Sequence, residues 1–360
     1  MTVYNFNPGP AILPTEVLRR AQEEMLDYHG TGLSILETSH RSTEYEAINA
    51  SAEARFKSLL GLGDEYRVLF VQGGASLQFA MLPMNRLPRD GVADYILTGA
   101  WSEKARDEAM KFGRVQIAAT TEAEGYRRVP RADEIKLSDA PVYVHLTSNN
   151  TIYGTQWHEW PETDGAPLVA DMSSDIFSRP LDAGRFSLIY GGAQKNIGPA
   201  GVVFVLARTD WLAGAPANVP TVLSYQTYAQ TNSLYNTPPV FAVYLLDLVL
   251  EWIANAGGLS AMGRRNEEKA AIIYDAVDGG GGYYTGHAEP ASRSRMNLTF
   301  RLPSPELEKR FVAEATAAKM IGLAGHRSVG GVRASLYNAM DAEGCRALAG
   351  FMNEFARRNG

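Results

Sequence analysis

Cysteine is nearly absent from this 360-residue sequence. Cys345 is the only one, so no disulfide bond can form within the chain. A single cysteine also argues against a metal held by cysteine thiolates, and we expect no metal site. A single cysteine also fits a reducing compartment. Runs of lysine and arginine are missing too, and the formal net charge of −6 argues against a general nucleic-acid-binding protein.

Neither a signal peptide nor a membrane-spanning run is evident. The first residues, MTVYNFNPGPAILP, contain no basic region followed by an apolar core. The most apolar helical stretch, residues 240–258, contains Asp247 and Glu251 and is too short to cross a bilayer. We therefore expect a soluble cytoplasmic protein without a membrane partner.

Short apolar runs that alternate with helical segments indicate the fold class. Amphipathic helices are predicted over 14–28 and 42–63, and a more apolar helix over 238–256. Strands are predicted at 66–72, 93–99, 114–120, 141–148, 167–173, 186–192 and 201–208. Because these runs show no sustained alternation of apolar and polar residues, we expect a mostly parallel, seven-stranded sheet between helices, in an α/β fold.

The pattern changes after residue 258. A helix over 257–278 and the loop GGGG at 279–282 are followed by the order strand, helix, strand, helix. This order predicts a smaller α/β domain behind a large one. The sequence is compatible with packing of the first dozen residues against either domain. We place the large domain at 16–258 and the small domain at 1–15 and 259–360.

Lys195 is a charged residue at the edge of a predicted core strand. It stands among small residues in IYGGAQKNIGPAGVVFV, just before a valine-rich run. An isolated lysine of this kind is usually a surface residue whose stem lies along apolar surface. The alternative is a desolvated amine with a lowered pKa, which can act as a nucleophile and form a Schiff base. The residues expected to lie near Lys195 decide between a surface lysine and a nucleophilic one.

Two neighbouring motifs could supply such partners. Asp171 ends the predicted strand PLVAD, and the carboxyl ends of parallel strands meet at one sheet edge. There an aspartate and a lysine can bracket a pyridine ring, although a strand-end aspartate is as often a cap or a loop anchor. The turn at 73–76, GGAS, joins a strand to a helix and can hold a phosphate. Gly-Gly is also a generic turn, and the segment is neither a Walker loop nor GxGxxG.

Trp101 and Thr151 also follow predicted strands. Trp101, in LTGAWSEKA, can stack on an aromatic cofactor ring or belong to the core. Thr151, in the polar loop TSNNTIYGTQ, can offer a hydroxyl to a ring substituent. Each signal is modest alone. Together, a phosphate-binding turn, a tryptophan, a threonine, an aspartate and a lysine are the parts of a pyridoxal-phosphate site.

The sequence strongly resembles the phosphoserine aminotransferases, a family of fold-type I, class V pyridoxal-phosphate enzymes. The resemblance covers essentially the whole chain and rests on long motifs in order. They are NFNPGPAILP, ETSHRSTEYEAI, VQGGASLQFAMLPMN, GAWSEKA, VADMSSDIFSRP, YGGAQKNIGPAGV, YNTPP, SRMNLTF and GHRSVGGVRASLYNAM. The resemblance implies pyridoxal 5'-phosphate as cofactor, together with a large cofactor-binding domain and a smaller C-terminal domain.

The resemblance also implies roles for individual residues. Lys195 would form the Schiff base, and Asp171 would partner the pyridine nitrogen. The other contacts within the subunit would come from Trp101 on the ring, Thr151 at its phenolic oxygen, and Ala75, Ser76 and Gln194 at the phosphate. The family implies a homodimer with active sites at the interface, where Asn236 and Thr237 reach the neighbour's cofactor phosphate. Some relatives have arginine in place of Ser76; if that arginine binds anions, this chain must use its other cations.

The cationic residues point to the substrates. Arg333 matches the family's α-carboxylate clamp, and a guanidinium suits that planar group. Two His-Arg pairs, His40-Arg41 and His326-Arg327, occur among only 6 histidines. A single such pair is usually a solvated surface pair, whereas two converging on one pocket would accommodate a phosphate or a side-chain carboxylate.

The implied reaction is a two-step, ping-pong transamination for L-serine biosynthesis. L-Glutamate would donate its amino group, and 3-phosphohydroxypyruvate would accept it and become O-phospho-L-serine. The sequence does not decide whether the phosphorylated 3-hydroxy-2-oxobutanoate of vitamin B6 (pyridoxine) biosynthesis is also a substrate, as it is for some bacterial relatives.

Three alternatives share parts of this site. A cysteine desulfurase needs a cysteine on a mobile loop, yet Cys345 lies in a predicted helix. A purine or alanine aminotransferase would not need two His-Arg pairs. A catalytically silent cofactor-binding protein would keep the ring contacts and lose the substrate cations, and here those cations are present.

Overall fold

The computed structural model describes residues 2–213, 216 and 218–360. Its main feature is a seven-stranded sheet in the order β2-β10-β9-β8-β5-β3-β4. The strands are β2 (Tyr66–Gly73), β3 (Val92–Leu97), β4 (Arg114–Thr120), β5 (Val144–Thr147), β8 (Leu168–Asp171), β9 (Leu188–Gly192) and β10 (Gly201–Arg208). β10 runs antiparallel to both of its neighbours, and the other pairs are parallel. The predicted fold class is therefore confirmed.

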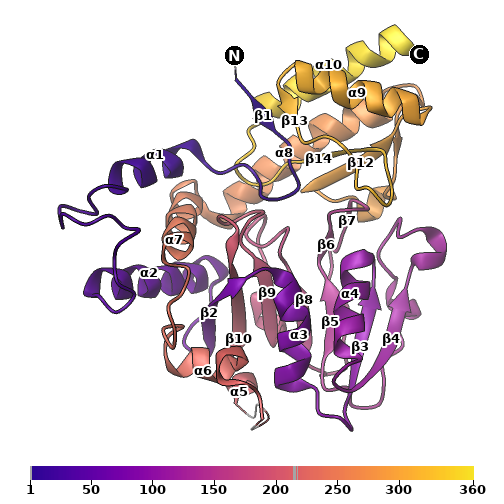
Figure 1. Cartoon of the computed structure of the whole chain (residues 1–360). Coiled ribbons are helices and arrows are strands. Elements are labelled where there is room, and N and C mark those ends of the chain that lie inside the picture. The colour runs from indigo at the N-terminus through magenta and orange to yellow at the C-terminus, as the bar shows by residue number, and fades with distance from the viewer. Residues whose placement is uncertain (1, 214–215, 217) are drawn as a thin grey trace.

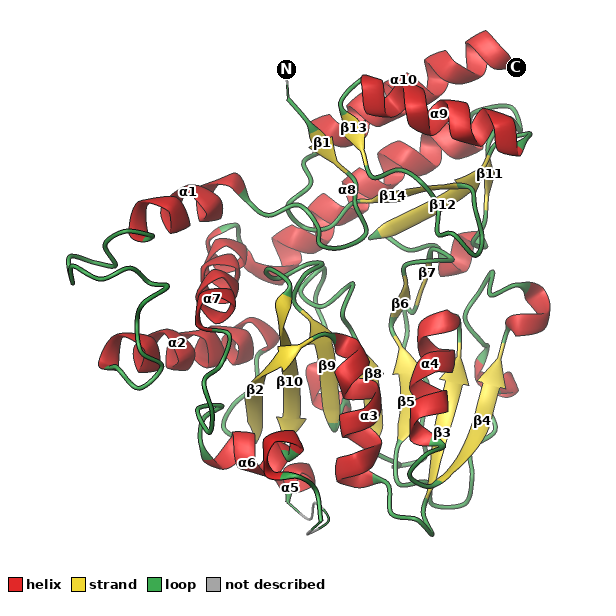
Figure 2. Ribbon diagram, in the orientation of Figure 1, coloured by secondary structure: helices red, strands yellow, loops and turns green. Residues whose placement is uncertain are grey.

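Helices cover both faces of this sheet (Figures 1 and 2). Core residues of α2 (Thr43–Leu60) and α7 (Val240–Asn255) pack with Val68 and Phe70 on one face. Core residues of α3 (Ala75–Arg86), α4 (Ala100–Ala109) and α6 (Tyr225–Gln230) pack with Leu69 and Val71 on the other. Adjacent residues of β2 thus point to opposite cores, which explains why residues 68–71 are all apolar instead of alternating.

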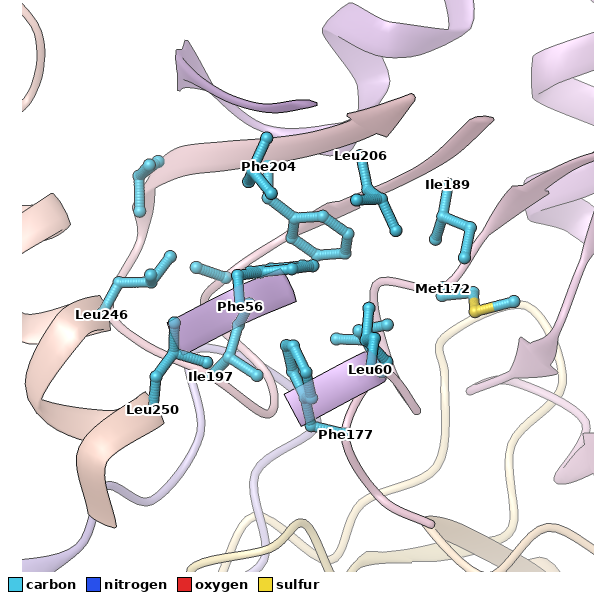
Figure 3. Close-up of a cluster of buried hydrophobic side chains, with 14 of the residues drawn as sticks. Phe56, Leu60, Met172, Phe177, Ile189, Ile197, Phe204, Leu206, Leu246 and Leu250 are labelled. Atoms are coloured by element: carbon cyan, nitrogen blue, oxygen red, sulfur yellow. The ribbon is translucent and has the colours of Figure 1, made fainter. Parts of the chain in front are cut away.

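The core under α2 and α7 also holds the turn that follows β9. Phe56 of α2 packs against Phe204 and Phe177, with ring centroids 5.0 and 4.6 Å apart. Ile197, two residues after Lys195, is fully buried in the same cluster (Figure 3). The lysine-bearing turn is therefore anchored by a core side chain.

The C-terminal elements form a second layer above the carboxyl ends of β3, β4 and β5, as Figure 2 shows. A long helix, α8 (Gly258–Asp278), leads to a three-stranded sheet of β11 (Thr285–Gly286), β12 (Asn297–Arg301) and β14 (Val332–Ser335). Helices α9 (Pro305–Ala317) and α10 (Ala342–Asn359) complete a separate core around Phe311 and Phe355.

The N-terminus joins this C-terminal layer. β1 (Tyr4–Asn5) pairs in parallel with β13 (Met320–Ile321), and Phe6 is fully buried in the C-terminal core. The chain then continues into α1 (Thr15–Glu24), which packs against α7 (Figure 1). The proposed domain limits, 16–258 and 1–15 with 259–360, remain a prediction.

Most predicted elements are present, with shifted ends. β3 and β5 are shorter than the runs at 93–99 and 141–148, and α1 ends at Glu24, earlier than expected. After α1, His29, Gly30 and Gly32 have positive φ values, and such backbone cannot continue a helix. Two short strands, β6 (Asn149–Asn150) and β7 (Thr155–Gln156), pair in the polar loop around Thr151 and were not predicted.

Among the described residues, no single helix is long and apolar enough to cross a membrane. The consecutive helices α7 and α8 have the required length and apolarity only when they are counted together, and they are bent by 85° relative to each other.

Candidate active site

A pocket of about 290 Å³ lies where the carboxyl ends of the parallel strands face the C-terminal layer. Its walls come from distant parts of the chain, including the N-terminal segment, the first turns of α3 and α4, and β14. The lining residues are Pro8, Gly9, Gly74, Ala75, Ser76, Phe79, Trp101, Thr147, Asn149, Thr151, Asp171, Ser173, Ser174, Gln194, Lys195, His326 and Arg333. The structure thus brings most of the predicted site residues into one cavity.

Lys195 stands in the turn between β9 and β10. Its side chain is partly buried and lines the pocket. Its Nζ lies 5.8 Å from the centroid of the Trp101 indole. Burial lowers the pKa of the Lys195 amine, and the charge of Arg333 lowers it further, while Asp171 opposes both. A lowered pKa gives the amine access to its neutral, nucleophilic form.

Asp171 is the last residue of β8 and is buried on the pocket floor. Its Oδ1 accepts hydrogen bonds from the backbone N–H of Ser173 at 2.9 Å and from the Ser173 hydroxyl at 2.5 Å. Its Oδ2 accepts no hydrogen bond from the described residues, so this oxygen is available to a ligand. Burial raises the pKa of Asp171, whereas Lys195 and Ser173 act to lower it.

The turn between β2 and α3 has the backbone geometry of an anion site. Gly73 has a φ of +112°, a conformation that favours glycine. α3 starts at Ala75 after Gly74, and no side chain caps it. The N–H of Leu77 donates to Gly74 O at 2.9 Å, so the N–H groups of Ala75 and Ser76 are the ones that remain available, and both residues line the pocket.

Trp101 and Thr151 contact each other across the pocket wall. Trp101 Nε1 donates to Thr151 Oγ1 at 3.2 Å. This bond fixes the indole and leaves the hydroxyl proton of Thr151 free to donate elsewhere. Lys104 lies over the same indole, with its Nζ 4.6 Å from the ring centroid.

Arg333 contributes a buried positive charge to the wall of the pocket formed by β14. It belongs to β14, is buried, and donates from Nη1 to the backbone oxygen of Thr151 at 2.9 Å, while its buried Nε has no partner among the described residues. Burial lowers its pKa from the ordinary value. His326 lies at the same wall, and burial and the charges of Arg333, Arg327 and Lys104 lower the pKa of its imidazole.

Five predicted residues do not line this pocket. Arg41 and Thr237 are exposed, and His40 and Asn236 are partly buried. Asn236 Nδ2 donates to Gln72 Oε1, near the anion-binding turn, at 3.3 Å. Arg327 is exposed beside His326. Of the two His-Arg pairs, only His326 reaches the pocket of its own chain.

Ser173 and Asn149 line the pocket but were not predicted. Ser173 orients Asp171, and its position in DMSSD, two residues after the aspartate, was a visible signal for such a turn. Asn149 Nδ2 donates to Ser174 Oγ and to Asn297 Oδ1, both at 2.8 Å. Nothing in the local sequence indicates that second contact, because Asn297 lies on β12 of the other layer.

Comparison with known proteins gives consistent matches over the full length. Residues 3–348 match the family Aminotransferase class-V. The chain is 64% identical over 360 residues to the phosphoserine aminotransferase of Herpetosiphon aurantiacus, covering 100% of both chains. It is 56% identical over 355 residues to that of Geobacillus kaustophilus, covering 99% of this chain and 98% of the relative.

Solved structures agree with these matches. The phosphoserine aminotransferase from Bacillus circulans subsp. alkalophilus superposes with a TM-score of 0.98 and 52% identity, covering 100% of this chain and 99% of that one. Another phosphoserine aminotransferase, solved in a study of radiation damage of its Schiff base, has a TM-score of 0.97 and 50% identity, with coverage of 99% and 100%.

Proposed function

The chain belongs to the phosphoserine aminotransferases of aminotransferase class V, and from this membership we propose how its pocket works. It catalyses the reversible transfer of an amino group from L-glutamate to 3-phosphohydroxypyruvate, giving O-phospho-L-serine and 2-oxoglutarate. The observation that carries this proposal is that Lys195 and the buried Asp171 line one pocket with Arg333, close enough for the charge of Asp171 to act on the pKa of the Lys195 amine.

The residues present fit pyridoxal phosphate. Asp171 Oδ2, which has no donor among the described residues, suits a protonated ring nitrogen. The uncapped first turn of α3 suits the phosphate, and Ala75, Ser76 and Gln194 line the cavity beside it. Trp101 presents an indole face, and the Thr151 hydroxyl is free to donate. Lys195 would hold the cofactor through its amine. When bound, the cofactor supplies an electron sink that stabilises negative charge on the substrate α-carbon.

The protein contributes proton transfer and orientation. Lys195 moves a proton at the substrate α-carbon, because its lowered pKa lets the amine act as a base and its ammonium form as an acid. Arg333 orients the α-carboxylate with a guanidinium that is already held by Thr151 O. Asp171 stays oriented by Ser173 throughout.

A coupled assay tests this proposal. Turnover with L-glutamate and 3-phosphohydroxypyruvate should greatly exceed turnover with alanine and glyoxylate. The reverse preference would contradict the assignment. Adding the phosphorylated 3-hydroxy-2-oxobutanoate as a third acceptor decides whether the vitamin B6 pathway substrate is used.

We further propose a homodimer that shares its active sites. His40, Arg41, Asn236 and Thr237 lie outside the pocket of their own chain. Large apolar side chains near the first pair are exposed, namely Leu26, Leu33 and Leu36. Exposed apolar surface of this kind supports a protein interface, and a second copy would bring the missing cations to the pocket.

Mixing two inactive variants tests the shared site. If Arg41 serves the partner's pocket, hybrids of Lys195→Ala and Arg41→Ala chains contain one intact site and regain activity. Hybrids that stay inactive, or a monomeric mass in light scattering, would contradict the dimer. A cytoplasmic location is a separate proposal, which fractionation of the source cells would test.

A further inference from the structure

Lys104 is a cation beside the pocket that the proposed mechanism does not use. It lies one turn after Trp101 on α4, and its side chain is exposed. Its Nζ stands 4.6 Å from the centroid of the Trp101 indole, within the range of a cation–π contact. Such contacts hold a flexible lysine near one position, so the ammonium is placed in advance by a residue of the site itself.

The charge of Lys104 is not neutralised by its neighbours. Glu103 accepts a hydrogen bond from Tyr126 Oη at 2.5 Å, and Glu108 pairs with Lys111 at 2.7 Å. Over the described part of the chain, Lys104 makes neither a hydrogen bond nor a salt bridge. Its three N–H donors are therefore available to a ligand.

Lys104 belongs to a group of positive charges on one side of the pocket. The imidazole of His326 experiences the charges of Arg333, Arg327 and Lys104 together. His326 and Arg333 line the pocket, whereas Lys104 flanks it through Trp101. Ser76, at the start of α3, also lines the pocket and contributes a hydroxyl and no charge. The ammonium groups of Lys104 and Lys195, in contrast, lie 4.6 and 5.8 Å from the centroid of the Trp101 indole, so positive charge is concentrated beside Trp101.

We propose that Lys104 is a specificity-determining residue that favours the phosphorylated substrate over glutamate. This inference rests on the proposed function. A phosphate monoester carries between −1.5 and −2 charges at pH 7, whereas the glutamate side chain carries −1. Since Coulomb energy is proportional to ligand charge, one ammonium stabilises the phosphate about twice as strongly. Lysine also suits this task because its compact charge imposes no fixed geometry on two anions of different shape.

The test compares Lys104→Gln with Lys111→Gln as a matched control. Lys111 follows the same helix, is exposed, and is already paired with Glu108. Stopped-flow half-reactions of the holoenzyme with O-phospho-L-serine and with L-glutamate would give an apparent dissociation constant for each amino donor at two salt concentrations. Lys104→Gln should weaken phosphoserine about fivefold and glutamate about twofold, as expected for one charge removed at about 8 Å in water. Both effects should shrink at about 1 M salt, and Lys111→Gln should change neither constant.

Lys104→Arg and circular dichroism control for misfolding. Arginine at this position should keep most of the preference for phosphoserine, because it keeps the charge over Trp101. Unchanged affinities in Lys104→Gln, or equal weakening of both ligands that is insensitive to salt, would overturn the inference and leave the transamination intact. Failure of the proposed function would appear differently, as a wild-type protein that does not use 3-phosphohydroxypyruvate.

Discussion

Asn338 donates its backbone N–H to Oδ1 of Asn196, the residue after Lys195, at 2.9 Å. Both side chains are buried. Asn338 follows β14, the strand of Arg333, and its Nδ2 also donates to Phe177 O at 3.0 Å. This contact therefore ties the strand that carries the candidate carboxylate clamp to the turn that carries the candidate Schiff-base lysine.

Replacing Asn196 should disturb both stability and catalysis. Asn196→Ala leaves the N–H of Asn338 and the carbonyl of Ile176 without their present partner. Losing such buried bonds costs about 1–3 kcal/mol, and the lysine turn gains freedom. We expect a lower unfolding free energy in denaturant and a reduced kcat. Asn359→Ala, which removes one bond near the C-terminus, is the control. An Asn196→Ala enzyme with wild-type kcat would show that the contact does not position Lys195.

Lys195→Ala should remove both turnover and the visible absorption band of the lysine-bound cofactor. The variant lacks the amine that holds the cofactor and moves the proton, and loss of a general base alone lowers rates on the order of 10²–10⁴-fold. Spectra of the purified protein and the coupled assay measure the two effects. Lys111→Ala should retain both properties. Normal turnover in Lys195→Ala would reject the assignment of this residue.

Asp171→Asn should preserve the shape of the pocket and lower both kcat and the affinity for the cofactor. An amide can still accept a hydrogen bond from Ser173, but it carries no negative charge to hold a ring nitrogen protonated. We expect kcat to fall by about 10²-fold or more and cofactor affinity to fall as well, measured by absorbance titration of the apoprotein. Asp175→Asn is a useful comparison, because Asp175 is similarly buried but contacts Ser148 and Gln156. Similar losses in both variants would argue that burial, not ring contact, makes Asp171 important.

Lys269 should make stability depend on pH. It is buried on α8 and donates to the carbonyls of Leu336 and Tyr337 at 2.8 and 2.9 Å. Burial lowers its pKa from 10.5 to about 7. Between these values the unfolded chain binds a proton that the folded chain does not, so this group makes stability rise with pH from about 7 to about 10.5. The slope is about 1.4 kcal/mol per pH unit.

Denaturant unfolding of wild type and Lys269→Met at pH 6, 7.5 and 9 checks this pH dependence. The wild type should gain stability relative to the variant as the pH rises above 7, while below pH 7 the difference should be constant. Lys111→Met, at an exposed position, should show a difference that does not change with pH. A constant difference for Lys269→Met as well would contradict the lowered pKa.

The sequence predicted the sheet well, because its strands are short, apolar and separated by helices. Residues 68–71 illustrate why: Val68 and Phe70 face one core and Leu69 and Val71 the other, so all four positions are apolar. Element ends were less predictable. α1 stops at Glu24 although apolar residues continue the helical spacing to Tyr28, and the first residue with a positive φ, His29, comes only five positions after the helix ends.

The pocket was predictable where local sequence carries the signal. Lys195, Asp171 and the turn at 73–76 each stand at a strand end among small residues, and all three meet in one cavity. Contacts such as Asn149 with Asn297 were not predictable, because they join two layers that are distant in sequence. The sequence also could not say that His40 and Arg41 lie outside the pocket of their own chain.

The reversed direction of β10 bears on the order in which the protein folds. β9 and β10 are joined by residues 193–200 alone and pair as an antiparallel hairpin around Lys195. Closing so short a loop costs little chain entropy. β2 pairs only with β10, which is far away in the sequence, and the pairing of β5 with β8 also requires a longer connection. The loop with the candidate cofactor anchor therefore belongs to the most local pairing of the sheet and should form early. Substitutions in 193–200 should accordingly slow refolding more than substitutions at the β2–β10 edge.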